Sequence, residues 1–253
     1  MKIVINKEYS NIKEWVEQLP NNFDNLGEIV YQARNTLKKM QLPNGEEVVV
    51  KKFAVPLFIN QIAYSFLRKC KARRAYENAE RLLSIGIDTP KPVFYIEIKK
   101  RGLFHQGYFG CINNPTPNIM REFVDYVNGG EEILKQFAAF TKMVHDKKVL
   151  HIDYSPGNII YTKQEDGTVT FSLLDLNRMQ FNKNLSRKER LFNFRRMFRC
   201  KESLAILVRE YARLCGWNQE EAIAEAIEYC NQFWIRTDKR NEYKRRRNER
   251  RKK

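Results

Sequence analysis

One segment of this chain, residues 151–158, restricts the possible folds more than any other, because its loop has the pattern H-x-D-x-x-x-x-N. The acid and the amide of the pattern are Asp153 and Asn158, and the loop lies between a predicted helix and a predicted strand. A second predicted strand ends at Asp175. A strand, a turn and a strand between Asn158 and Asp175 would bring both strand ends to one edge of a sheet.

Two Asp and one Asn in this arrangement are the set that phosphoryl transfer needs. One Asp accepts or orients the proton of a substrate hydroxyl, while a second Asp and an Asn hold the magnesium ions that bridge the phosphates of ATP. Mg²⁺ prefers hard oxygen ligands, which a carboxylate and an amide supply. We interpret His151 as a residue that packs and hydrogen-bonds the loop and not as a base.

The order of predicted elements is strands with one long helix, a break at 128–130, and then mostly helices. Ser10 is the predicted N-cap of the first helix and Pro20 its end, while Gly216 separates two helices near the C-terminus. The predicted strands are 2–5, 29–31, 37–42, 48–50, 93–98, 108–112, 159–162 and 169–174; the predicted helices are 11–19, 59–85 and 131–148, with further helices over 187–235.

A cation on the phosphates is the next requirement, and residues 48–53 contain two adjacent lysines before Phe53. Because alternate residues of a strand face opposite sides, one of Lys51 and Lys52 at most points to a ligand. We choose Lys51, which shares a face with the apolar side chains of that strand. Its partner should be a Glu on the following helix, and helical phase leaves Glu77 and Glu80 both open.

The charge balance predicts an anionic partner. The chain has 46 Lys and Arg against 30 Asp and Glu, a formal charge of +16, which suits a nucleic acid, an acidic membrane surface or a phosphorylated substrate. Residues 236–253 hold eleven of the basic residues and three acids, so they are either a solvated helix end or a docking tail.

Cysteine usage and hydropathy bear on the compartment. The five cysteines form no C-x-x-C pair, which favours free thiols in a reducing compartment, without a zinc site or a disulfide framework. The N-terminus lacks the apolar stretch of a signal peptide, and we find no apolar run of membrane-spanning length. We therefore expect any encounter with a membrane to occur at its surface.

These motifs resemble the lipopolysaccharide kinase family, the Kdo and heptose kinases of bacterial envelope synthesis, which is a branch of the protein-kinase-like superfold. The resemblance covers about residues 28–180. It is carried by the catalytic loop and following strand at 151–160, by Leu174 and Asp175, and by residues 49–51, 86–90 and 144–146.

The resemblance implies a two-lobed α+β fold: an extension at 1–27, an N-lobe and hinge at 28–126, a mostly helical C-lobe at 127–235, and a basic tail at 236–253. It also implies site roles. These are Asp153 as catalytic base, Asn158 and Asp175 as Mg²⁺ ligands, Lys51 on the ATP phosphates with Glu77 as its partner, and a hinge near 122–126 with Glu122 and Val124.

Two departures from protein kinases qualify this picture. The turn at 33–36 has no glycine, so we expect Arg34 and backbone amides to cover the phosphates in place of a G-x-G-x-x-G loop. Asp175 is followed by Leu176 and Asn177 instead of Phe and Gly, and no A-P-E segment follows. Both departures disfavour a regulated protein kinase and are compatible with a small-molecule or glycolipid kinase.

The leading hypothesis is therefore an ATP- and Mg²⁺-dependent kinase of a lipid-linked core sugar. It would act in the cytoplasm at the inner face of the cytoplasmic membrane, with the tail on anionic lipid. The alternatives are a soluble kinase of the aminoglycoside or choline type, a pseudokinase scaffold, and a nucleic-acid-binding protein acting through its tail, although residues 1–235 resemble no nucleic-acid module. The sequence leaves the acceptor sugar and the oligomeric state open.

Overall fold

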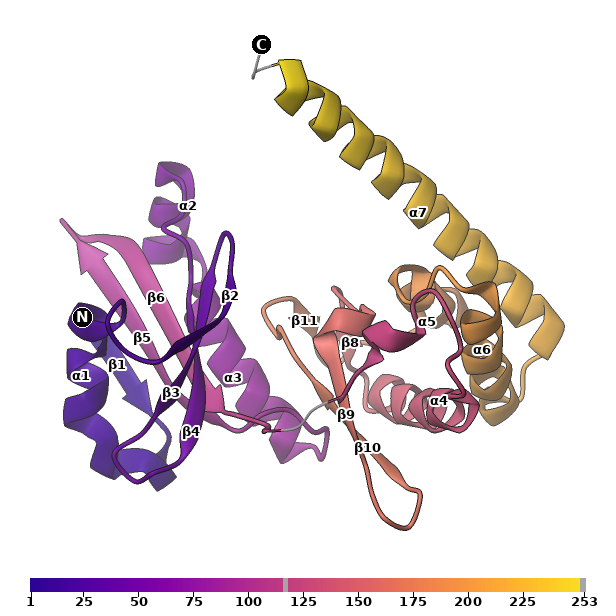
Figure 1. Cartoon of the computed structure of the whole chain (residues 1–253), viewed down its shortest axis with the longest axis horizontal. Coiled ribbons are helices and arrows are strands. Elements are labelled where there is room, and N and C mark those ends of the chain that lie inside the picture. Colours follow the sequence, from indigo (N-terminus) through magenta and orange to yellow (C-terminus); the bar gives the residue numbers. More distant parts are fainter. Residues whose placement is uncertain (116–117, 251–253) are drawn as a thin grey trace. The chain divides into compact units, whose positions relative to one another are not determined.

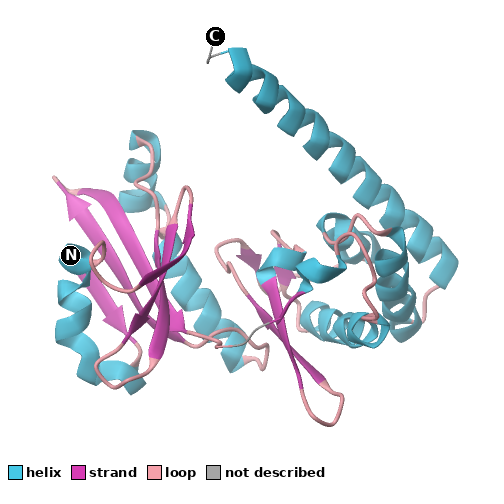
Figure 2. Cartoon of the chain, in the orientation of Figure 1, coloured by secondary structure: helices cyan, strands magenta, loops and turns pink. Residues whose placement is uncertain are grey.

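The computed structural model describes residues 1–115 and 118–250, and the chain divides into two compact units (Figures 1 and 2). Unit 1 comprises 1–116 and 175–177, and unit 2 comprises 117–174 and 178–253. The division falls ten residues before the boundary expected after residue 126, because a short strand, β7 (Asn118–Ile119), pairs with β9 (Ile159–Lys163) of unit 2.

Unit 1 is built on a six-stranded antiparallel sheet with strand order β1-β5-β6-β4-β3-β2. The strands predicted at 29–31, 37–42 and 48–50 form an antiparallel meander, and the amide of Gly45 closes its second turn on the carbonyl of Leu42. The strands are β1 (Lys2–Ile5), β2 (Glu28–Gln32), β3 (Thr36–Gln41), β4 (Glu47–Lys52), β5 (Pro92–Lys100) and β6 (Leu103–Ile112); the helices are η1 (Lys7–Ile12), α1 (Lys13–Asn22), α2 (Phe58–Ile62), η2 (Ala63–Leu67) and α3 (Lys71–Ser84).

Helices cover both faces of this sheet (Figure 1). Phe94 and Ile96 of β5 pack in the core cluster that contains α1, whereas Tyr95 between them packs in the cluster that contains α3. This alternation is the period of two that a strand imposes. The segment 1–27, expected as an extension of the lobe, is thus part of unit 1: β1 pairs with β5, and α1 fills one face of the sheet.

Three helix boundaries differ from the sequence predictions. Ser10, the predicted N-cap, lies inside η1, and α1 begins at Lys13 without a side-chain cap. Pro20 lies inside α1, which continues two residues beyond it, and burial of Val16 and Leu19 on the same helix offsets the backbone hydrogen bond that the proline cannot donate. The helix predicted over 59–85 is divided into α2, the π-helical η2 and α3. The chain is extended at Arg68 and Cys70, and the Cys70 thiol caps α3 by accepting a hydrogen bond from the Arg73 amide.

Unit 2 is mainly helical, with two small antiparallel sheets of order β10-β9-β7 and β11-β8. On α4, spacings of four, three and four residues predict one apolar stripe, of which Ile133, Phe137 and Val144 are buried and Phe140 is partly buried. Gly216 ends α6 in the left-handed conformation. The elements beside β7 and β9 are η3 (Met120–Phe123), α4 (Glu131–Asp146), β8 (Leu150–His151), η4 (Pro156–Asn158), β10 (Val169–Leu173), β11 (Met179–Gln180), α5 (Arg187–Asn193), η5 (Phe194–Arg196), α6 (Lys201–Cys215) and α7 (Gln219–Arg250).

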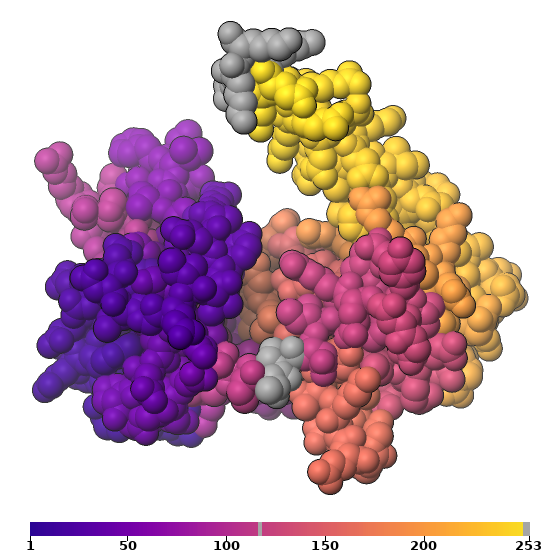
Figure 3. Space-filling view, viewed as in Figure 1, coloured from indigo at the N-terminus to yellow at the C-terminus, as the bar shows by residue number. Residues whose placement is uncertain are grey.

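The predicted basic tail continues α7 as a helix through residue 250, and residues 251–253 lie outside the described part of the chain. The indole of Trp234 still donates to the Phe198 carbonyl, and Arg199 pairs with Asp238 at 2.7 Å. From Lys239 onward the described side chains are exposed, and this end of α7 stands clear of the rest of unit 2 (Figure 3). Within 1–115 and 118–250, we find no helix that is both long enough and apolar enough to cross a bilayer.

A buried histidine joins three helices of unit 2. The amide of Asn193 on α5 donates to the His151 carbonyl at 3.0 Å, so its oxygen accepts from Nε2 of His145 on α4 at 3.1 Å. Nδ1 of His145 then accepts from the Tyr211 hydroxyl of α6 at 2.8 Å. Burial lowers the pKa of His145 to about 4, because desolvation disfavours the imidazolium.

We predict that unit 2 loses stability as the pH falls from 6.5 to 4. In this window the unfolded chain, with a histidine pKa near 6.5, binds a proton that folded His145 does not, so unfolding becomes easier by roughly 3 kcal/mol across the window. Urea unfolding at a series of pH values should show this slope, and His145→Gln should flatten it. His105→Gln, in unit 1, should keep most of it; equal slopes in the wild type and His145→Gln would contradict the assignment.

Candidate active site

The loop that carries Asp153 is held by hydrogen bonds within unit 2. The side-chain amide of Asn158 donates to the Asp153 carbonyl at 2.9 Å. The carbonyl of Asn158 accepts from the amide of Leu174, the residue before Asp175 in the chain, at 2.8 Å. Below the loop, buried Tyr154 shares a hydrogen bond with Thr141 of α4. The backbone at Asp153 and Asn158 is therefore fixed.

His151 has the supporting role that the sequence suggested. Its side chain is buried, and Nε2 donates to the Leu174 carbonyl at 2.9 Å. Its own carbonyl receives the amide of Asn193. Because both bonds tie the loop to neighbouring backbone and to α5, His151 positions the segment on either side of Asp153.

Two arginines that sequence reasoning missed pair with Asp153. Arg178 reaches its carboxylate at 3.2 Å, and Arg196 of η5 forms a second ion pair with the same oxygen. The Arg178 carbonyl also accepts from the Ile152 amide, beside the β8–β11 pairing. Arg178 could have been suspected from its place three residues after Asp175, but no local pattern marks Arg196, which the fold of α5 and η5 brings to the loop.

In unit 1, Asp175 is paired with Lys51, whose Nζ lies 3.0 Å from Oδ1. Asp175 has φ of +53°, a left-handed conformation that is uncommon outside glycine and clusters at functional positions. The Asn177 amide donates to the same Oδ1 at 2.6 Å. Lys52 instead pairs with Asp24 at 3.1 Å.

The two lysines lie on opposite faces of the sheet, as strand alternation predicts. Nζ of Lys51 is 5.3 Å from the ring centre of Phe53, in the cluster that packs on α3. Nζ of Lys52 is 5.0 Å from the ring centre of Phe23, in the cluster that packs on α1. Lys51 therefore lies on the face of the sheet that α3 covers.

The expected pair of Lys51 with Glu77 is not formed in this structure, which is a correction. Glu77 accepts from Arg73 at 2.8 Å, one turn earlier on α3, and from Lys69 at 2.7 Å. The alternative, Glu80, accepts from the Tyr76 hydroxyl. Helical spacing explains both local bonds, since residues four apart share one face of a helix.

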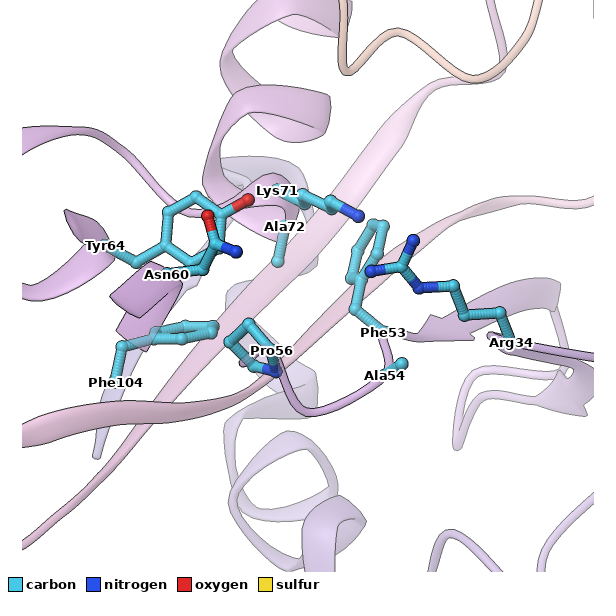
Figure 4. A pocket seen from close by; sticks show the side chains of 9 residues that line it. All are labelled: Arg34, Phe53, Ala54, Pro56, Asn60, Tyr64, Lys71, Ala72 and Phe104. Carbon is cyan, nitrogen blue, oxygen red and sulfur yellow. The ribbon is translucent and has the colours of Figure 1, made fainter. Parts of the chain in front are cut away.

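Further cations surround Lys51 within unit 1. Arg34, from the turn between β2 and β3, lines a pocket with Lys71 of α3 and Phe53 (Figure 4). Burial, together with the positive charges of Arg34, Lys51 and Arg74, lowers the pKa of Lys71. Lysines crowded in this way favour an anionic ligand, because an anion relieves their mutual repulsion. Arg34 and Lys71 thus line one pocket, and Lys71 is a cation that the sequence did not single out.

The segment expected to form the hinge, 122–126, makes hydrogen bonds within unit 2. Glu122 lies in η3 and accepts a hydrogen bond from the Tyr161 hydroxyl. The carbonyl of Val124 already accepts from the amides of Arg199 and Cys200, both at 2.8 Å. The Val124 carbonyl is thus used within unit 2, and the hinge role of Glu122 and Val124 stays a prediction. The covalent connection between the units follows β6, around residues 113–118.

The donor atoms fit the magnesium ion that a kinase requires. Asp175 supplies a carboxylate, and Asn158, whose amide nitrogen is engaged by Asp153, keeps its side-chain oxygen for a cation. Across residues 1–115 and 118–250 we find no group of three or more His, Cys, Asp or Glu side chains arranged to hold a metal. Mg²⁺ in kinases usually takes few protein ligands, because phosphate oxygens supply several of its ligands.

Comparison with known proteins decides the family. The family model described as lipopolysaccharide kinase (Kdo/WaaP) matches residues 32–216, which include Lys51, Asp153, Asn158 and Asp175. The chain belongs to this family. It is therefore a kinase, and the resemblance noted over 28–180 extends through α6.

Solved structures show the fold. WaaP in complex with acyl carrier protein is 14% identical, with a TM-score of 0.58 over 94% of this chain and 99% of that chain. The Rio2 kinase–ADP/Mg²⁺–phosphoaspartate complex from Chaetomium thermophilum is 12% identical, with a TM-score of 0.47 over 88% of this chain and 71% of that one. None of the curated proteins matches the chain. The predicted two-lobed, protein-kinase-like α+β fold is confirmed.

We predict that the two neighbouring lysines differ sharply in function. Lys51→Met removes the cation paired with Asp175 and should lower kcat/KM for ATP by roughly 10²-fold, as loss of one charged donor does elsewhere. Lys52→Met, the matched control on the opposite face of the sheet, should stay within a few-fold of wild type. Calorimetric titration with nucleotide and steady-state kinetics measure both, and equal effects would mean that Lys51 does not serve the phosphates.

Proposed function

We propose that this kinase transfers the γ-phosphoryl group of ATP to a hydroxyl of a lipopolysaccharide core sugar, Kdo or heptose, at the inner surface of the cytoplasmic membrane. The family supplies the reaction class. The observation that carries the acceptor class is the double ion pair of Asp153 with Arg178 and Arg196. Core sugars of this kind carry carboxylates and phosphates, which arginines bind well.

Arginines are concentrated around this loop beyond those two. A side-chain atom added at Gly157 would lie 2.6 Å from the Arg121 guanidinium, so Arg121 packs directly on the loop. Arg195, next to Arg196, has its pKa lowered by burial and by the charge of Arg196. Four guanidinium groups at this loop, two of them paired with Asp153, leave a positive excess that suits an anionic acceptor better than an aminoglycoside, which is itself cationic.

The proposed reaction is an in-line displacement. The acceptor oxygen forms a bond to the γ-phosphorus while the bond from that phosphorus to the β–γ bridging oxygen breaks, and ADP leaves with the electron pair. Asp153 takes the hydroxyl proton. Arg178 and Arg196 hold the Asp153 carboxylate in place, so that its second oxygen is presented to the acceptor.

The nucleotide roles follow from the residues of unit 1. Lys51, Lys71 and Arg34 are proposed to neutralise the ATP phosphates, the last from the turn between β2 and β3. Asn158 and Asp175 are proposed to hold Mg²⁺, which when bound offsets the charge of the phosphates.

Acceptor assays test the proposal directly. Purified enzyme with labelled ATP should phosphorylate lipid A carrying Kdo or heptose, and should leave free aminoglycosides and choline unmodified. Mass spectrometry of the core from cells with and without the protein should show the loss of one phosphate. Turnover confined to aminoglycosides or choline would replace the proposal with the soluble-kinase alternative.

Binding of a protein partner can be tested separately. The similar WaaP structure is a complex with acyl carrier protein, and we propose an acidic carrier protein of that kind as a candidate partner for this basic chain. Co-elution of the two purified proteins at low salt would support it, and separate elution would remove it.

We predict that Asp153→Asn keeps the fold and nucleotide binding but lowers turnover by orders of magnitude. The amide preserves shape and can still accept from Arg178, yet it does not take the acceptor proton. Asp166→Asn, at the exposed turn between β9 and β10, is the matched control and should be silent. Near-normal phosphorylation by Asp153→Asn would remove the assignment of the base.

The exposed end of α7 is proposed to bind anionic lipid through charge alone. Deleting 240–253, which spares the Arg199–Asp238 pair, should weaken sedimentation with anionic vesicles and leave turnover of a delipidated acceptor unchanged. Added salt should erase the difference, because each exposed cation contributes about 1 kcal/mol that is screened within a Debye length. Lost activity on the delipidated acceptor would show instead that this segment supports the fold of unit 2.

A further inference from the structure

Residues 57–67, which form α2 and η2 in unit 1, have an inverted distribution of polarity. Every exposed side chain in this segment is apolar, and every half-buried one is Asn, Gln, Ala, Tyr or Ser. Ile59 is 80% exposed and Phe66 73%. The full exposed set is Leu57, Phe58, Ile59, Ile62, Phe66 and Leu67.

The half-buried side of the segment is held by hydrogen bonds within unit 1. Ser65 donates to the Gln61 carbonyl and accepts from the Phe104 amide of β6, both at 2.7 Å. The Gln61 amide donates to the Pro56 carbonyl at 3.0 Å. These bonds fix the rotation of the segment, so the outward direction of Phe58, Ile59, Ile62 and Phe66 is set by the fold. In a water-facing helix the apolar stripe faces the core instead.

A groove rich in cations borders this apolar face. Phe66 and Leu67 line it together with five basic side chains and one carboxylate, Glu97, which accepts from the Cys70 thiol. Glu77 offsets two of the cations, Lys69 and Arg73. The five basic residues are Lys2, Arg68, Lys69, Arg73 and Lys99. The excess of positive charge lies directly beside the exposed apolar side chains.

We propose that residues 57–67 are an interfacial anchor that docks unit 1 on an anionic bilayer. Phe58, Ile59, Ile62 and Phe66 enter the boundary between headgroups and acyl chains, about 5–10 Å deep. The basic groove receives the lipid phosphates beside them, as anionic headgroups lie next to the acyl boundary. This combination of a contiguous apolar face with adjoining cations is the pattern of membrane-surface segments, and large exposed apolar patches are rare without such a role.

The anchor bears on the membrane part of the proposed function but is tested without ATP or sugar. Full-length protein is sedimented with vesicles of phosphatidylglycerol and phosphatidylethanolamine in 0.5 M NaCl, where the charge of α7 is screened. Phe58→Ser/Ile59→Ser/Phe66→Ser should lower the vesicle partition coefficient at least tenfold. Leu83→Ser/Phe192→Ser, which alters two exposed apolar residues of other helices, should leave it within twofold.

Two further measurements separate a loss of membrane insertion from a loss of folding. Thermal midpoints of all variants should agree within a few degrees, since the replaced side chains are exposed, and the single change Ile59→Asp serves if the triple variant is unstable. An added tryptophan in Ile59→Trp should shift its emission to the blue on vesicle addition and be quenched by brominated lipid. Absence of both changes would overturn insertion.

Two other binding partners could cover the apolar face, and evidence for either one in place of lipid would overturn the proposal. Unchanged vesicle binding with loss of a dimer in the triple variant would assign the face to a second copy of the chain. Unchanged vesicle binding with loss of an acidic carrier protein would assign it to that partner. Vesicle binding as predicted, with no phosphorylation of core sugars, would support the anchor and refute the proposed function alone.

Discussion

The hydrogen bonds of Asn193 are the constraint on which the placement of Asp153 depends. Its amide group joins His145 of α4 to the carbonyl of His151, at the entry of the catalytic loop. The donor and acceptor of one side chain are both used, so rotation of that side chain would break two buried bonds. The neutral state of His145 belongs to the same network, because its second nitrogen accepts from Tyr211.

A second organising feature of the molecule is the placement of cations beside carboxylates. Each unit collects cations around one carboxylate: Lys51 beside Asp175 in unit 1, and Arg178 with Arg196 around Asp153 in unit 2. A carboxylate alone would repel both phosphate and an acidic acceptor. The surrounding cations reverse that sign, which suits the anionic acceptor proposed above and which the total charge of +16 reflects in part.

The two surfaces proposed to meet lipid use different physics. The end of α7 exposes charge without an apolar face, so its attraction is long-ranged and sensitive to salt. Residues 57–67 expose apolar side chains beside cations, so their attraction is short-ranged and persists in salt. Long-range capture followed by local insertion is a common division of labour in peripheral proteins.

The fold class, the meander, the buried stripe of α4 and the family could be predicted from the sequence, because strand alternation, helical periodicity and the spacing of Asp153, Asn158 and Asp175 are local properties. Which side chains meet became known only from the packing of the folded chain. Arg196 reaches Asp153 across 43 residues, Lys51 binds Asp175 across 124, and the Val124 carbonyl is occupied by distant amides. Such partners are set by long-range packing, which no local pattern encodes.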